Sequence, residues 1–235
     1  MSVTVSNGKD RAGRLVWDLP LRLAHWALVV TVAGAWITHY AGIQWFGWHR
    51  RLGYATLVLV TFRIVWGFVG TRHARFANFV RGPAAVLAFL RAGGRADTPG
   101  HSPLGALSVV AMLALLLVQA LTGLFANDEI ANAGPFYGWV TQQTSNRISG
   151  LHATNSNLLL GLVALHVAAI GWYVFGLGRP VLRAMLTGRK DPREVATGDE
   201  ITGSRIALAL AVLAALAVAL ALAIRAAPEA TVALF

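Results

Sequence analysis

LHATNSNLLLGLVALHVAAIGWYV (residues 151–174) contains no Asp, Glu, Lys or Arg, and it is long enough to cross a bilayer as a helix. The stretch carries two histidines, His152 and His166. Fourteen residues at about 100° each end within roughly 40° of a whole number of turns, so both imidazoles share one helix face, about 21 Å apart along the axis. This spacing suits a helix that offers one ligand near each side of a membrane. Two unrelated polar residues on a bundle-facing stripe are the simpler alternative.

Hydrophobic composition extends this interpretation to the whole chain. Apolar residues make up 56% of the 235 positions and charged residues only 13%, which is unlike a soluble domain. Together with 152–175, further apolar runs at about 22–43, 49–70, 103–126 and 206–225 predict an all-α integral membrane protein with five spans. The last run is almost pure Ala, Leu and Val, so we expect it to be an anchor or a partner-facing helix.

The chain contains no cysteine. This excludes disulfides, thiolate-bound iron–sulfur clusters and a covalent c-type haem, so any metal must be held by His, Met or carboxylates. The first 21 residues are polar, end in the basic LPLR and lack the layout of a cleavable signal. We therefore expect the first apolar run to remain in the protein as a helix.

Basic residues predict the orientation. Of the 20 Lys and Arg residues, fifteen fall in the N-terminal segment and in the loops 71–102 and 176–205, and four fall on the other side: Arg50, Arg51, Arg147 and Arg225. The positive-inside rule then predicts a cytoplasmic N-terminus and a periplasmic C-terminus. The net charge of +10 is explained by these loops, and no motif of a nucleic-acid-binding module accompanies it. Within the 71–102 loop, Pro83 and Gly93-Gly94 bound a short predicted helix, 81–94, that we expect to lie on the cytoplasmic interface.

The predicted topology places histidines in pairs. His25 begins the first span on the inner side, level with His166, and His49 begins the second span on the outer side, level with His152. Two bis-histidine haems, one at each depth, would use these four imidazoles as axial ligands. His39 is an open alternative to His49, because it lies fourteen residues after His25 and would place four ligands on two helices.

Arg63 is an unusual charge within a span, fourteen residues after His49. A guanidinium at this depth needs an acceptor, and a haem propionate would provide one. Snorkelling to the headgroups is the alternative. Gly53 and Gly67 repeat the same interval, and they would let a flat macrocycle approach the helix or would simply favour helix–helix contact.

Several motifs together resemble one known family. They are VWDLPLRLAHW (16–26), WHRRLGY (48–54), FRIVWGF (62–68), RHARFANFVRGP (72–83), HSPLG (101–105) and LHATNSNLLLGLVALH (151–166). The chain is similar to the bacterial di-haem cytochrome b561 family, in the branch related to the b-type cytochrome subunits of Ni/Fe-hydrogenases. The resemblance implies a four-helix transmembrane bundle with two non-covalent b haems in a domain of residues 1–195. The segment 196–235, with the fifth helix at about 206–225, is then a C-terminal extension.

The resemblance also implies a function. Family members transfer electrons between membrane quinone and a redox partner in the respiratory chain of the bacterial inner membrane. The partner is a periplasmic c-type cytochrome, a hydrogenase-like enzyme or, in some relatives, superoxide. In that setting the chain is an electron-transfer haemoprotein, and it could be the quinone-reactive subunit of an oxidoreductase. A homodimer is a possible oligomeric state. The matching ligands are His25 and His166 for the inner iron, and His49 and His152 for the outer iron. From their positions in the second span, Arg63 is a candidate partner of a haem propionate and Gly53 a candidate for haem packing.

Other assignments stay open. Arg72, His73 and His101 are candidates for a cytoplasmic quinone site, although headgroup or propionate contact explains them equally well. Gln119 and Thr122 in the third span could form hydrogen bonds between helices or could line the haem pocket, and neither role is assigned. A proton or solute transporter without haem is the alternative function from a different class of protein. Transporters tend to have spans broken by Gly or Pro in the middle, whereas here the prolines lie outside the five spans, apart from Pro103 at the start of one.

Overall fold

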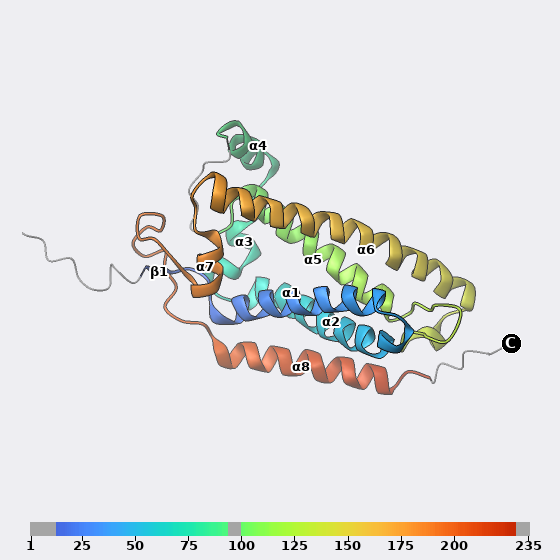
Figure 1. Ribbon diagram of the computed structural model, residues 1–235. Helices are drawn as coiled ribbons and strands as arrows, with labels where there is room; N and C mark the ends of the chain where they lie inside the picture. Colours follow the sequence, from blue (N-terminus) through green and yellow to red (C-terminus); the bar gives the residue numbers. More distant parts are fainter. Residues whose placement is uncertain (1–12, 94–99, 229–235) are drawn as a thin grey trace, which may run out of the picture. The chain divides into compact units, whose positions relative to one another are not determined.

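The computed structural model describes residues 13–93 and 100–228. Within these ranges five helices are long and apolar enough to cross a membrane: α1 (Leu19–Tyr40), α2 (Phe46–Val69), α5 (Pro103–Gly123), α6 (Gln142–Gly171) and α8 (Ile206–Arg225) (Figure 1). The five predicted spans are therefore confirmed as helices, with ends that differ by a few residues except at α6. Gly94 and three of the counted charges, Lys9, Arg11 and Arg95, lie outside the described residues.

Side-chain caps explain where three of these helices begin. The Asp18 carboxylate accepts the main-chain N–H of Leu21 at 2.8 Å, and α1 begins at the next residue after Asp18. Ser102 caps α5 in the same way through the N–H of Gly105, at 3.1 Å. Thr141 caps α6 through the N–H of Thr144, at 3.2 Å. Each cap satisfies a donor that has no acceptor inside its helix, which fixes the helix start independently of hydropathy.

The start of α6 lies ten residues before the predicted span. Its first two turns carry Gln, Thr, Ser, Asn and Arg, which a hydropathy reading excludes from a span but which a helix accepts. Ser145 is fully buried there and donates to the carbonyl of Phe125 at 2.6 Å. Ser149 accepts the N–H of Asn127 at 2.9 Å. These bonds tie the polar end of α6 to the loop that follows α5.

Shorter elements connect the long helices. They are the single-turn helices Ile43–Trp45, Arg72–Ala74, α3 (Phe76–Phe79) and Tyr137–Trp139, with α4 (Pro83–Arg91) and α7 (Val181–Thr187). The helix predicted within 81–94 is confirmed as α4, which begins at Pro83 as expected. Its position on the membrane interface stays a prediction. Two features were not predicted: a π-helical turn at Trp172–Gly176 ends α6, and β1 (Arg14–Leu15) pairs antiparallel with β2 (Arg189–Lys190).

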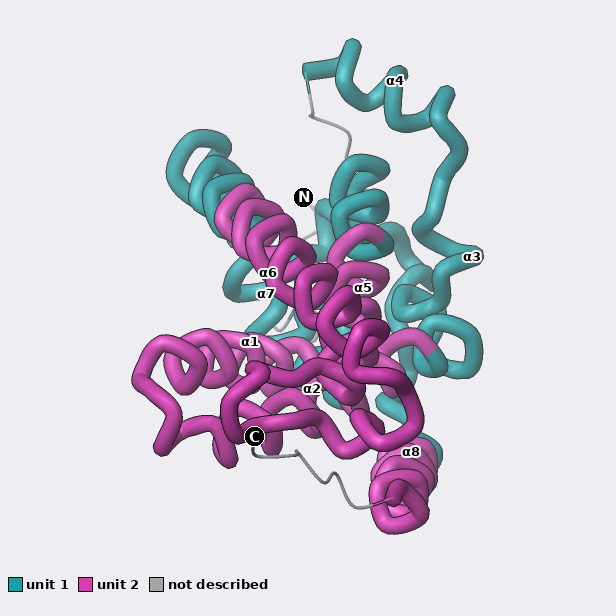
Figure 2. The backbone as a smooth tube through the Cα atoms, turned by 90° about the vertical axis from the view of Figure 1, so that its right-hand side faces the viewer, with its two compact units in different colours: residues 1–23, 65–110, 166–209 teal, residues 24–64, 111–165, 210–235 magenta. Residues whose placement is uncertain are grey.

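The chain forms two compact units, and each long helix contributes residues to both (Figure 2). The first unit contains 1–23, 65–110 and 166–209, and the second contains 24–64, 111–165 and 210–235. In the first unit, Asp18 is fully buried and accepts hydrogen bonds from Trp66 Nε1 at 3.1 and 3.2 Å and from the hydroxyl of Thr71. These bonds join the start of α1 to the end of α2.

The second unit has an apolar core and an aromatic rim. Its fully buried side chains include Val60 and Phe62 of α2. Tyr40, Trp45 and Trp48, at the junction of α1 and α2, are 79%, 45% and 52% exposed. Exposed Trp and Tyr at helix ends are typical of a membrane–water interface. This distribution indicates that the α1–α2 junction lies at headgroup level.

Candidate functional site

His49 is held in a defined tautomer near the start of α2. Its Nδ1 lies 2.8 Å from the main-chain carbonyl oxygen of Ala35 on α1. A carbonyl only accepts hydrogen bonds, so Nδ1 carries the proton and Nε2 keeps its lone pair. Metal-binding histidines are oriented in this way by a hydrogen bond from the other ring nitrogen. His49 therefore has the arrangement expected of an axial ligand.

His152 on α6 is held in the same tautomer by two residues of α5. Its Nδ1 lies 3.0 Å from Thr122 Oγ1, and its Nε2 lies 3.0 Å from Gln119 Nε2. The amide NH₂ of Gln119 only donates, so Nε2 of His152 accepts and Nδ1–H donates to Thr122. The lone pair that the Gln119 amide contacts is the one that would bind iron.

Asn155 fixes the orientation of the Gln119 amide. Asn155 Nδ2 donates to Gln119 Oε1 at 2.7 Å and to the Leu115 carbonyl at 3.0 Å, so the NH₂ group of Gln119 faces His152. Gly123 of α5 also lies close to the ring: a Cβ there would come within 3.1 Å of His152 Cε1. The glycine therefore gives the imidazole room against α5.

The structure brings His49 and His152 close together within the second unit. Their ring centroids are 6.4 Å apart and the rings are inclined by 80°. One metal ion bonded to two imidazoles at about 2 Å each would separate the ring centroids by about 6 Å, once roughly 1 Å from nitrogen to centroid is added for each ring. The observed separation of the two rings is therefore close to that expected for two imidazoles that share one metal ion.

His39 also lies near this pair. Its ring centroid is 5.8 Å from that of His49, with an inclination of 50°. Its side chain is exposed, whereas those of His49 and His152 are half-buried. The structure thus places the two competing histidines of the outer site next to each other, with His49 the more enclosed of the two.

The two glycines of α2 have different surroundings. A Cβ on Gly53, one turn after His49, would meet nothing within 4 Å. A Cβ on Gly67 would lie 2.0 Å from a ring carbon of Phe76. Gly67 therefore accommodates the Phe76 ring, which explains this glycine by protein packing. Gly53 lies beside open space and fits the predicted role of admitting a flat group.

Arg63 is 6% exposed, so its side chain is enclosed by protein and does not extend over the helix surface. This burial does not favour the snorkelling alternative. Elsewhere in the second unit, the side-chain donor groups Trp26 Nε1 and Thr56 Oγ1 are buried without a hydrogen-bond partner among the described residues. Buried polar atoms in this condition are uncommon and are typical of sites that hold another group.

The inner pair is divided between the two units. His25 lies on α1 in the second unit, where its ring packs edge-on against Trp26 with centroids 5.3 Å apart. His166 lies on α6 in the first unit. Both side chains are half-buried. The pairing of His25 with His166 stays a prediction.

The three candidate quinone residues lie in the first unit, and each has a protein contact. Arg72 forms a salt bridge with Asp199 at 2.7 Å, and His73 Nε2 lies 2.6 Å from the Asp199 carbonyl. The His101 ring packs against Trp17 and Phe79, with centroids 4.6 and 4.5 Å away. The role of segment 198–200 in holding Arg72 and His73 was not predicted from the sequence.

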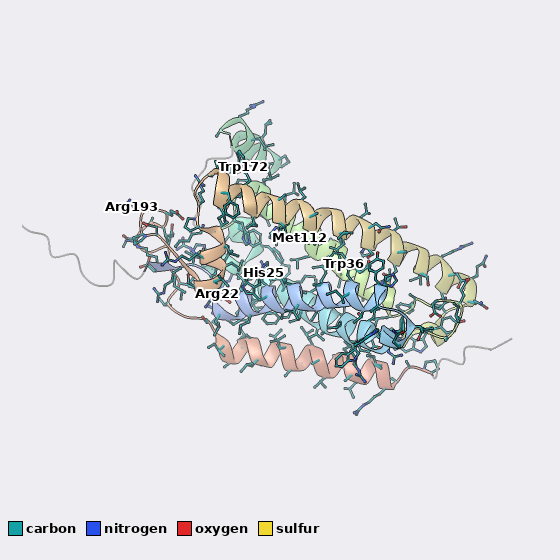
Figure 3. All side chains as sticks on the ribbon, in the orientation of Figure 1. Arg22, His25, Trp36, Met112, Trp172 and Arg193 are labelled. Atoms are coloured by element: carbon teal, nitrogen blue, oxygen red, sulfur yellow. The ribbon has the colours of Figure 1, made fainter. Side chains whose placement is uncertain are left out.

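Sequence reasoning missed the network around His152. Gln119 and Thr122 are three residues apart on α5, and His152 and Asn155 are three residues apart on α6. Such pairs lie on one helix face, so two polar pairs on apolar helices were a usable signal. Trp36 of α1 adds another link through Nε1, which donates to Ser156 Oγ on α6 at 3.0 Å (Figure 3).

Fold and site together indicate a multi-pass helical membrane protein in which His49 and His152, on two of the long helices, lie close together. The sequence matches the family described as prokaryotic cytochrome b561 over residues 16–188, which is most of the chain, and the protein belongs to this family. The predicted relation to b-type cytochromes of Ni/Fe-hydrogenases is thereby confirmed. Membership implies binding of haem b and transmembrane electron transfer. No curated protein and no solved structure matches the chain.

Proposed function

We propose that the protein transfers electrons across the bacterial inner membrane, between quinone and a redox partner, through two bis-histidine b haems. The outer pair is His49 and His152, and the inner pair is His25 and His166. The observation that carries this proposal is the outer pair: two half-buried imidazoles with centroids 6.4 Å apart, each with its Nδ1 hydrogen-bonded by the protein.

Hydrogen bonds to Nδ1 prepare both rings for this role. The Ala35 carbonyl and the Thr122 hydroxyl accept from the two Nδ1–H groups, which fixes ring orientation and raises the basicity of Nε2. A bound haem supplies a one-electron iron couple at each site. The residues around the rings determine the position, the polarity and the solvent access of that couple.

Helix α6 connects the two proposed sites. His152 and His166 lie fourteen residues apart on this one helix, or about 21 Å along its axis. That separation is comparable to most of the hydrocarbon thickness of about 30 Å. Two redox centres at these heights divide the membrane crossing into shorter electron transfers.

Arg63 and Gly53 complete the proposed sites. Arg63 is buried on α2, and its guanidinium is suited to a haem propionate because it offers a forked pair of donors. Gly53 lies beside open space one turn from His49, where a macrocycle could approach the helix. Arg72, His73 and His101 are the proposed quinone-facing residues on the cytoplasmic side.

The redox partner belongs on the periplasmic side in this proposal. With the N-terminus inside, the outer haem lies near the α1–α2 junction and is the exit toward a c-type cytochrome or a hydrogenase-like enzyme. The exposed Tyr40, Trp45 and Trp48 at that junction are compatible with an interfacial position.

Proteoliposomes that enclose ferricyanide test the proposal directly. External quinol should reduce the haem and then consume the enclosed ferricyanide faster than in protein-free vesicles. His152→Ala should abolish the accelerated rate while leaving one haem that quinol reduces. Failure of quinol to reduce any haem, or a His152→Ala rate equal to the wild-type rate, would contradict the proposal.

A further inference from the structure

A polar pocket lies in the first unit, apart from the histidine pairs. It has a volume of about 260 Å³ and is lined by Thr71, Arg72, Arg75, Asn78, Glu200, Ile201, Thr202, Gly203 and Arg205. Its residues come from the segment after α2 and from the segment before α8. Arg205 and the residues from 200 to 203 lie beyond the part of the chain that matches the family, so the pocket combines family and non-family segments.

Charge in this pocket is mainly positive. Three arginines line it, and Glu200 is the one carboxylate among the lining residues. Glu200 Oε2 accepts the main-chain N–H of Gly198 at 2.9 Å. Asp199, outside the lining, pairs with Arg72 at 2.7 Å. Arg75 and Arg205 form no described salt bridge, so their charges are available to an anion.

Main-chain carbonyls fix two of the guanidinium groups. Arg75 Nε donates to the Gly70 carbonyl at 2.9 Å, and Arg205 Nη1 donates to the Val69 carbonyl at 3.0 Å. Both carbonyls belong to the C-terminal end of α2, where carbonyl groups lack partners within the helix. A guanidinium has five N–H groups, so each bond leaves donors for a second acceptor.

The position of the pocket at the ends of two apolar helices predicts that it lies at headgroup depth. The membrane-spanning part of α2 ends at Val69 and that of α8 begins at Ile206, directly beside the lining residues. Basic pockets between membrane helices at this depth are suited to the phosphate of an anionic lipid. Arginine is also the side chain best matched to phosphate geometry.

We propose that this pocket binds the phosphate group of an anionic phospholipid, with Arg75 and Arg205 as the principal donors. The lipid would then connect the end of α2 to the start of α8. This proposal concerns lipid recognition only, and its test does not depend on which histidines bind haem.

Native mass spectrometry of the purified haem protein in detergent tests the site. Phosphatidylglycerol, phosphatidylcholine and inorganic phosphate are titrated separately into the wild type, Arg75→Gln, Arg205→Gln and Arg193→Gln. Arg193 is the matched control, because it is an exposed arginine of the same unit (Figure 3) and does not line the pocket. Haem absorbance is recorded for every variant.

Phosphatidylglycerol should bind the wild type in preference to phosphatidylcholine. Each pocket substitution should weaken this binding by about fivefold, and Arg193→Gln should leave it unchanged. An equal loss in the control would mean general attraction to a basic surface and would overturn the proposal. Displacement of the lipid by millimolar inorganic phosphate would also overturn the proposal, because the site would then bind free phosphate. Pocket variants that lose haem but still bind the lipid would overturn it too.

Discussion

Hydrogen bonding at single residues distinguishes a ligand from an ordinary buried histidine. His49 and His152 each have Nδ1 hydrogen-bonded to an oxygen acceptor, which leaves Nε2 as the nitrogen that can bind a metal. Nε2 of His152 accepts a hydrogen bond from the Gln119 amide at 3.0 Å, so this bond must give way when a metal binds. His39 has no such described bond and is exposed. The residue-scale argument for His49 therefore rests on tautomer and enclosure, which spacing alone does not reveal.

Substitution of the two competing histidines tests this choice. His49→Ala should lower the haem content from two per chain to one, because the outer iron loses an axial ligand, while His39→Ala should retain both haems. Haem quantification and low-temperature spectra measure the outcome. Loss of one haem in His39→Ala, with both retained in His49→Ala, would refute the choice of His49.

Thr122 is predicted to position His152. Thr122→Val keeps the side-chain shape but removes the acceptor of Nδ1–H, and comparable losses weaken metal binding by roughly tenfold or more. We expect lower occupancy and a shifted potential for the outer haem only. Thr122→Ser should restore both.

Thr154→Val is the control for that experiment. Thr154 is an exposed residue of α6 whose hydroxyl donates only to Gly150 of its own helix, at 2.9 Å. The Thr154→Val substitution should leave the occupancy and the potential of both haems unchanged. A Thr122→Val protein with wild-type potentials would show that Thr122 does not position the ring.

Among the elements, hydropathy predicted the five long helices but not how they begin or end. Three starts are set by Asp18, Ser102 and Thr141, whose caps depend on local geometry. Hydropathy excluded the first turns of α6 because they are polar, yet the loop after α5 binds them. The two-residue strands β1 and β2 come from distant parts of the sequence, so no local pattern predicts them.

For the candidate site, as for the helices, the sequence predicted the main residues but not the contacts that hold them. Spacing and topology predicted that His49 and His152 lie at the same depth, and in the second unit their ring centroids are 6.4 Å apart. Their role as haem ligands stays a prediction. The network of Gln119, Thr122 and Asn155 was not predicted, because the rotamers that connect these side chains depend on how α5 and α6 pack. The His25–His166 pairing remains a prediction.

The loop after α5 is predicted to resist acid. Partial burial tends to raise the pKa of Asp128, but hydrogen bonds from Asn132, Ala131 and Ile130 outweigh it and lower the pKa to about 2, from 3.8. A depressed pKa stabilises the loop above pH 3.8, and this contribution is lost as the pH falls through about 2. Pepsin should therefore cleave the loop slowly at pH 4.5 and faster near pH 2, relative to a reference peptide. Asp128→Ala should be cleaved rapidly at both values, and equal resistance of this variant at pH 4.5 would contradict the account.

For the whole molecule, the distribution of basic residues predicts the orientation in the membrane. Fifteen of the 20 Lys and Arg residues lie on the side assigned to the cytoplasm, so reporters fused in the loops 71–102 and 176–205 should give cytoplasmic signals. A reporter after Arg225 should give a periplasmic one. A periplasmic signal from the 71–102 loop would reverse the orientation and exchange the inner and outer assignments.

The haem content of the purified protein tests the central claim most directly, because both histidine pairs must be occupied for a complete electron path. Extraction with acid acetone followed by a pyridine haemochrome assay should release all haem, with a b-type band and a ratio of two haems per chain, since the sequence contains no cysteine to hold haem covalently. A ratio near one, or haem that stays with the protein after extraction, would contradict the account.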